Sequence, residues 1–131
     1  HYLAQGKPAY VPYVHLQTTQ AIALLHDAGA VPVLAHPIRL GMPPHILEAL
    51  ICSLQAQGLQ GVEVFHPSAS RGDVRALENL TRRLGLLVTG GSDFHGDRGT
   101  RTKLGGLPSG WHTWQADLLA LQTSIAATHS G

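Results

Sequence analysis

The stretch that decides the fold is GVEVFHP, residues 61–67. It starts at a glycine, continues as an apolar run of strand length and ends at a His-Pro pair. Similar apolar runs lie on either side of it, at residues 31–35 and 86–89. An amphipathic helical pattern separates each run from the next, and this alternation is typical of parallel strands joined by right-handed helical crossovers. The sequence therefore predicts an α/β fold of parallel strands with flanking helices.

Four amphipathic patterns predict helices. They cover residues 18–28, 43–57, 70–84 and 113 onward. Ser70 followed by Asp73 is the pattern of a capping box at the start of the third helix. The residues expected to face the core are Ile22, Leu25, Ala28, Ile46, Leu47, Leu50, Ile51, Leu54, Val74, Leu77, Leu80, Leu84, Leu118, Leu121 and Ile125.

Composition limits the size and class of the protein. The 131 residues suit one domain, and 44% hydrophobic against 13% charged residues favours a folded chain. A net charge of +1 argues against nonspecific binding to nucleic acids or membranes. With one cysteine, Cys52, and no apolar run long enough to span a bilayer, the sequence favours the reducing cytoplasm. Three strands are too few to close a barrel, so we expect part of a barrel or a small open sheet.

Histidine and aspartate follow all three expected strands. His36, His66 and the pair Asp93 and His95 stand where ligands bind in parallel α/β folds, beyond the carboxyl ends of the strands. Taken singly, a histidine before proline is more often a turn residue, and the aspartate could equally cap its loop. Taken together they favour a site. In an extended segment Asp93 and His95 would face the same cavity, and imidazole with carboxylate suits Zn, Mn or Fe.

Five motifs carry a family resemblance. They are YLAQGKPAYVP (2–12), VLAHPIR (33–39), GVEV (61–64), GSDFH (91–95) and LGGLP (104–108). In this order they resemble the C-terminal part of a metallophosphoesterase of the PHP (polymerase and histidinol phosphatase) family. The closest resemblance is to the branch that acts on nucleoside 3′,5′-bisphosphates and on the 5′ ends of short RNAs.

The resemblance implies a fold and a metal centre. The fold would be the C-terminal portion of a distorted (βα)7 barrel, with residues 1–131 as a single part of that domain and 1–16 as an extended leading segment. The centre would hold up to three divalent ions, with Asp93 on the first, His95 on the second and His36 on the third. The family's remaining ligands precede this region, so we expect the isolated chain to be inactive. Glu63 is interpreted as a half-buried strand carboxylate with a local partner, not as the bridging ligand.

Three residues are candidates for binding phosphate: Arg39, His66 and Lys7. Arg39 follows His36 closely, and its planar guanidinium suits a bidentate phosphate contact. Arg98, Arg101 and Lys103 are weaker candidates that are more simply read as solvated loop charges. The other histidines are interpreted as surface or packing residues.

The resulting hypothesis is a metal-dependent phosphoesterase of nucleotides or short RNA. The alternatives are a non-catalytic binding module with an incomplete metal site and another chemistry of the same family, such as histidinol phosphate hydrolysis. Expected partners are a phosphorylated nucleotide or a short RNA, with no membrane. Self-association through the incomplete barrel face is a further possibility.

Overall fold

The computed structural model describes residues 2, 6–11, 15–96, 103–106, 119–120 and 122–123. The elements follow one another as α1 (Thr18–Asp27), β1 (Val33–Leu34), the 3-10 helix η1 (Pro37–Leu40), α2 (Pro44–Ala56), β2 (Gly61–Phe65), α3 (Arg71–Arg83) and β3 (Leu87–Gly90). All three predicted strands are present, although β1 is shorter than the apolar run that predicted it.

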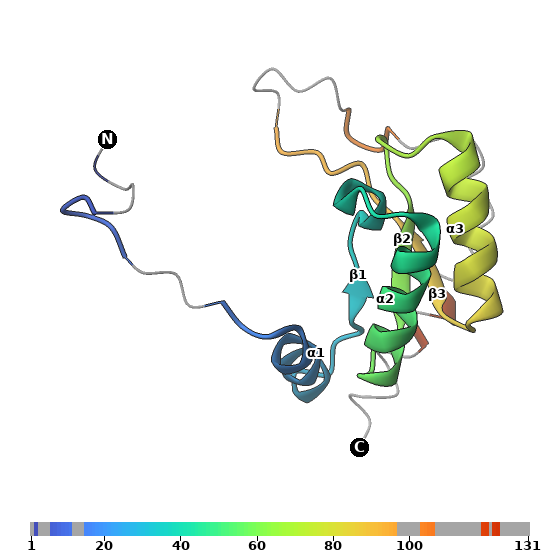
Figure 1. Cartoon of the computed structure of the whole chain (residues 1–131), viewed down its shortest axis with the longest axis horizontal. Helices are drawn as coiled ribbons and strands as arrows, with labels where there is room; N and C mark the ends of the chain where they lie inside the picture. Colours follow the sequence, from blue (N-terminus) through green and yellow to red (C-terminus); the bar gives the residue numbers. More distant parts are fainter. Residues whose placement is uncertain are drawn as a thin grey trace.

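The three strands form one parallel sheet in the order β1-β2-β3. Two crossovers of the same hand, stepping in one direction along the sheet, place their helices on the same face. Figure 1 shows α2 and α3 side by side against the strands, with α1 near the start of β1. The α/β prediction is therefore confirmed, and the carboxyl ends of all three strands meet at one edge.

The core lies between the sheet and the two crossover helices. Leu47, Ile51 and Leu54 of α2 and Val74, Leu77 and Leu80 of α3 pack on the central strand, where Val62 and Val64 are fully buried. Because side chains alternate along a strand, Glu63 between these two valines points to the opposite face. The two helices therefore cover one face of the sheet, and Glu63 lies on the other face.

Some residues expected in the core lie at the surface. Ile46 is 44% exposed and Leu25 is 41% exposed, and Ala28 is exposed as well. Of α1 only Ile22 is buried, because the described part of the chain covers this helix on a single narrow side. The apolar pattern identified the helices correctly and overestimated the width of the face that each one buries.

Helix α3 begins as its sequence predicts. The Ser70 hydroxyl accepts a hydrogen bond from the Asp73 N–H at 3.1 Å, and the Asp73 carboxylate accepts one from the Ser70 N–H at 2.9 Å. Hydrogen bonding of the Asp73 carboxylate with the Ser70 side chain, and secondly with the Ser70 backbone N–H, lowers the pKa of Asp73 below its ordinary value. The capping box therefore fixes the start of the helix that leads from β2 to β3.

The predicted fourth helix, and the loop of about residues 96–110 that carries Arg98, Arg101 and Lys103, fall mostly outside the described residues. Of the helix, residues 119–120 and 122–123 are described and are helical, and of the loop only residues 96 and 103–106 are described. Where the structure describes the chain, no helix has the length and apolar character needed to cross a bilayer.

Candidate active site

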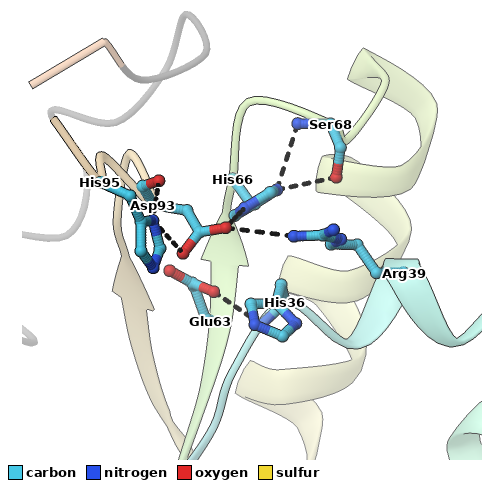
Figure 2. A network of polar contacts seen from close by, with 7 residues as sticks. All are labelled: His36, Arg39, Glu63, His66, Ser68, Asp93 and His95. Atoms are coloured by element: carbon cyan, nitrogen blue, oxygen red, sulfur yellow. Dashed lines mark hydrogen bonds and ion pairs between the residues drawn. The ribbon is translucent and has the colours of Figure 1, made fainter. Parts of the chain in front are cut away.

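Three strand ends bring their polar residues together. His36 follows β1, His66 follows β2 and Asp93 follows β3, and Figure 2 shows the three side chains converging with that of Arg39. The His36 and His66 rings meet edge to face with their centroids 5.7 Å apart. His66 Nε2 lies 3.8 Å from Asp93 Oδ2. The expected convergence at one rim of the sheet is therefore present.

Asp93 is the centre of this cluster. Its Oδ2 accepts a hydrogen bond from Arg39 Nη1 at 3.1 Å, and its Oδ1 lies 3.5 Å from His95 Nδ1. The expectation that residues 93–95 form an extended segment is wrong, because Asp93 has a φ of 51°. His95 nevertheless stays beside it, since its Nδ1 also bonds to the Asp93 carbonyl oxygen at 2.7 Å.

His36 is held through its backbone. Its N–H donates to Glu63 Oε2 at 2.6 Å, so Glu63 has the local partner that the sequence led us to expect. His36 has a φ of 32°, and it and Asp93 are the two non-glycine residues with positive φ in the described chain. Such backbone conformations are costly and cluster at functional sites. Both lie here, at the end of the sheet where the histidines and aspartate gather.

Gly91 makes room for the Glu63 carboxylate. A Cβ at position 91 would lie 2.6 Å from Glu63 Oε1, well inside van der Waals contact. A glycine immediately after β3 thus allows the carboxylate to sit between the strand ends and reach His36.

An open polar pocket lies over the cluster. Its lining residues are Arg39, His66, Pro67, Ser68, Ser92, Asp93, Lys103 and Gly106. Arg39 and Lys103 bring two positive charges to it, and its volume of about 620 Å³ suits a small-molecule ligand. Lys103 was read as a solvated loop charge, whereas the structure brings it to the pocket wall.

The candidate metal ligands are near one another without forming a complete site. Imidazole and carboxylate are suitable donors for Zn, Mn or Fe. In residues 15–96 and the shorter described stretches, however, no three His, Cys, Asp or Glu side chains are grouped so that they could hold an ion. The imidazole and carboxylate groups are therefore of the right chemical type for such a metal. They are too few and too widely spaced to hold an ion by themselves.

Other predicted residues lie elsewhere. Lys7 is exposed in a turn and does not line the pocket. His26 bonds through Nε2 to the Gly58 carbonyl at 2.9 Å, as a packing histidine would. Sequence reasoning missed Ser68 and Ser92, although the spacing His66-Pro-Ser68 is a turn pattern in which a serine can return to the ring.

A second, more apolar groove runs between η1, α2 and α3. It is lined by Ile38, Met42, Leu47 and Leu77 among others, and the ion pair between Arg83 and Glu48 lies at its rim. None of the clustered histidines or Asp93 reaches it. The polar pocket is therefore the candidate active site.

The chain is similar in sequence to curated proteins. The chain is 39% identical to the 3′,5′-nucleoside bisphosphate phosphatase of Chromobacterium violaceum over 94 residues, which are 72% of this chain and 33% of that protein. It is 32% identical to a 5′-3′ exoribonuclease of Haemophilus influenzae over 94 residues, again 72% of this chain and 34% of the relative. The chain thus spans about a third of the length of these relatives. No family model matches it.

Solved structures agree with the sequence relatives. An amidohydrolase from Chromobacterium violaceum, with bound sulfate and no metal, has a TM-score of 0.62 and 34% identity over 88% of this chain and 42% of its own. A protein from Bifidobacterium adolescentis, described as a metal-dependent phosphoesterase, has a TM-score of 0.65 and 30% identity over 92% of this chain and 41% of its own. In sequence and in fold, then, this chain is related to one part of the metal-dependent phosphoesterases, the group to which its PHP-like motifs point.

Proposed function

We propose that this chain carries part of the active site of a metal-dependent phosphoesterase that hydrolyses nucleoside 3′,5′-bisphosphates or the 5′ ends of short RNAs. The observation that carries the proposal is the single pocket that joins Arg39, Lys103 and the buried His66 to Asp93 at the strand ends. Two cations and an imidazole N–H donor around one carboxylate can bind a phosphoryl group next to a metal-binding position.

The charge arrangement supports a phosphate ester as the ligand. Arg39 can present two parallel N–H groups to phosphoryl oxygens, while Lys103 adds a point charge from the opposite loop. The similar Chromobacterium violaceum structure holds a sulfate, an anion of the same shape and hydrogen-bonding character as phosphate. These groups would hold the phosphate and orient its scissile bond.

Metal binding is assigned to His36, Asp93 and His95, with the remaining ligands supplied from outside the described cluster. When bound, divalent metal supplies a hydroxide nucleophile at neutral pH and neutralises phosphoryl oxygens. Mn, Zn and Fe suit these donors, and a centre of up to three ions is proposed from the resemblance. Arg39 is placed to hold the Asp93 carboxylate in position until it becomes a ligand.

A substrate panel tests the proposal. The native protein is assayed for release of phosphate from a nucleoside 3′,5′-bisphosphate, of a nucleoside 5′-monophosphate from a 5′-phosphorylated trinucleotide RNA, and of phosphate from histidinol phosphate. Each assay is run with Mn²⁺, Zn²⁺ or chelator. We expect metal-dependent release from the first two substrates. Release from histidinol phosphate alone would assign the other chemistry of the family.

A binding module with an incomplete metal site is the second candidate. It is favoured by the observation that the described residues contain no group of three potential ligands. It predicts nucleotide binding by calorimetry without phosphate release under any metal condition. We further propose a cytoplasmic location. Self-association through the incomplete barrel face is a prediction that sedimentation velocity checks.

A further inference from the structure

His66 has an unusual environment for a histidine in this cluster. It follows β2 directly and its side chain is only 7% exposed. Its Nε2 is the one buried side-chain nitrogen or oxygen without a hydrogen-bond partner among the described residues. A buried polar atom without a partner is costly, and it calls for an explanation in terms of a ligand or a role.

The other ring nitrogen has its partners. The Ser68 N–H donates to His66 Nδ1 at 3.1 Å, and Ser68 Oγ lies 2.7 Å from the same nitrogen. Figure 2 shows both contacts on one side of the ring. A backbone N–H can only donate, so Nδ1 must offer its lone pair, and the Ser68 hydroxyl donates to it as well. This contact therefore assigns the proton of the neutral imidazole to Nε2.

The assignment decides what Nε2 can do. A ring nitrogen that carries a proton has no lone pair for a metal, so Nε2 is a hydrogen-bond donor in this tautomer. It faces the pocket whose wall includes Arg39, Asp93 and Lys103. Asp93 Oδ2 is 3.8 Å away, too far for a hydrogen bond, and already accepts one from Arg39. Figure 2 shows Nε2 directed toward Asp93 at the wall of this pocket, and no acceptor among the described residues lies within hydrogen-bond distance of it.

We propose that His66 donates its Nε2–H to a phosphoryl oxygen, is fixed in this tautomer by Ser68, and is not a metal ligand. This inference rests on the proposed function and specifies the role of one residue in it. Arg39 and Lys103 would supply the charge that attracts the phosphate, while His66 would supply direction from a rigid, buried position. The chemical class recognised is a phosphate monoester.

Two measurements test the proposal. The first is a long-range ¹⁵N–¹H NMR correlation of the imidazole rings in the native protein, without metal or substrate, assigned by comparison with His66→Gln. We expect a pyrrole-type shift at Nε2 of His66 and a pyridine-type shift at Nδ1. The reverse pattern would overturn the assignment, whether or not the protein hydrolyses nucleotides.

The second measurement separates phosphate binding from metal binding. His66→Phe keeps a buried ring and loses the donor, so inorganic phosphate should bind about ten- to a hundredfold more weakly at unchanged metal content. His66→Gln keeps an N–H donor at nearly the same reach and should recover most of the affinity. Thermal unfolding of both variants checks that they fold. Loss of bound metal in His66→Phe, or equal phosphate affinity in all three proteins, would show that His66 is not a phosphate donor.

Discussion

Arg39 has two chemical roles in the cluster, since its guanidinium holds Asp93 and reaches the pocket. Arg39→Lys keeps the charge and loses the planar pair of donors, so it should raise KM and lower kcat/KM without changing metal content. Arg39→Ala should lower kcat/KM by about ten- to a hundredfold, the equivalent of one charge-assisted hydrogen bond. Steady-state kinetics of the native protein with the nucleoside bisphosphate measures this.

Arg75 is the matched control, because it is an exposed arginine on α3 away from the pocket. Arg75→Lys and Arg75→Ala should leave kcat/KM unchanged. If the Arg39 variants behave like the Arg75 variants, Arg39 is a rim charge only and the phosphate contact belongs to Lys103.

Glu63 stabilises the backbone of His36. Glu63→Ala would leave the His36 N–H without its acceptor and should lower the free energy of unfolding by about 1 to 3 kcal/mol, with a smaller loss for Glu63→Gln. Gly91→Ala should displace the same carboxylate, because the new Cβ would lie 2.6 Å from Oε1. Urea unfolding compares these variants with Glu78→Ala, which removes a partly exposed ion pair with Arg82 within α3. A Glu63→Ala loss no larger than that of Glu78→Ala contradicts the assigned role.

The sequence predicted which residues meet at the site better than it predicted how they are held. His36, His66, Asp93 and His95 could be named because each follows a strand end. The contacts of Glu63 with the His36 N–H and of Ser68 with the His66 ring could not, because they depend on the local backbone. The left-handed conformations of His36 and Asp93 could not be predicted either, because His and Asp adopt positive φ more often than most residues but still in a small minority of cases.

At the scale of the elements, the capping box of α3 is the clearest local determinant. Ser70→Ala should lower the free energy of unfolding by about 1 kcal/mol, because the Asp73 N–H loses its acceptor. Urea unfolding at neutral pH measures the loss, and Ser53→Ala, an exposed serine within α2, is the control. If the Ser70→Ala variant and the parent have equal stability, the capping box does not stabilise the fold.

The same box predicts a dependence on pH. The pKa of Asp73 is lowered in the folded chain, so its contribution to stability is complete above the pKa of the unfolded chain and is lost as pH falls through the folded value. The stability difference between the parent and Asp73→Asn should therefore shrink as the pH falls below about 4. Urea unfolding of both proteins at several pH values between neutral and acid measures it. A stability difference that does not change with pH would show that the pKa of Asp73 is not lowered in the folded chain.

The positions of the strands and helices could be predicted from sequence periodicity, but the exposure of individual residues on them could not. The run around β2 could be assigned because an apolar segment between two helices fits a central parallel strand. The outward positions of Leu25 and Ile46 could not be predicted, since a helix buries only the side that neighbouring elements cover. The pattern of one helix contains no information on its neighbours.

For the whole molecule, the sheet brings together candidate donors from three separate strand ends, and they do not make a complete metal site. The 131-residue chain by itself should therefore bind Mn²⁺ weakly and release little phosphate from a nucleoside bisphosphate. Calorimetric metal titration and a phosphate assay of this chain check both expectations. Turnover comparable to that of an intact phosphoesterase would mean that a second copy or an undescribed segment completes the ligand set.

The most direct test of a metal-dependent phosphoesterase site at the strand ends is to measure metal content and phosphate release together in the native protein and in Asp93→Asn. The account predicts that the native protein binds divalent metal and hydrolyses the bisphosphate. Asp93→Asn should lose both, while Glu78→Gln, on α3 and outside the lining of the pocket, should lose neither. An Asp93→Asn variant that retains full metal content and full turnover would contradict it.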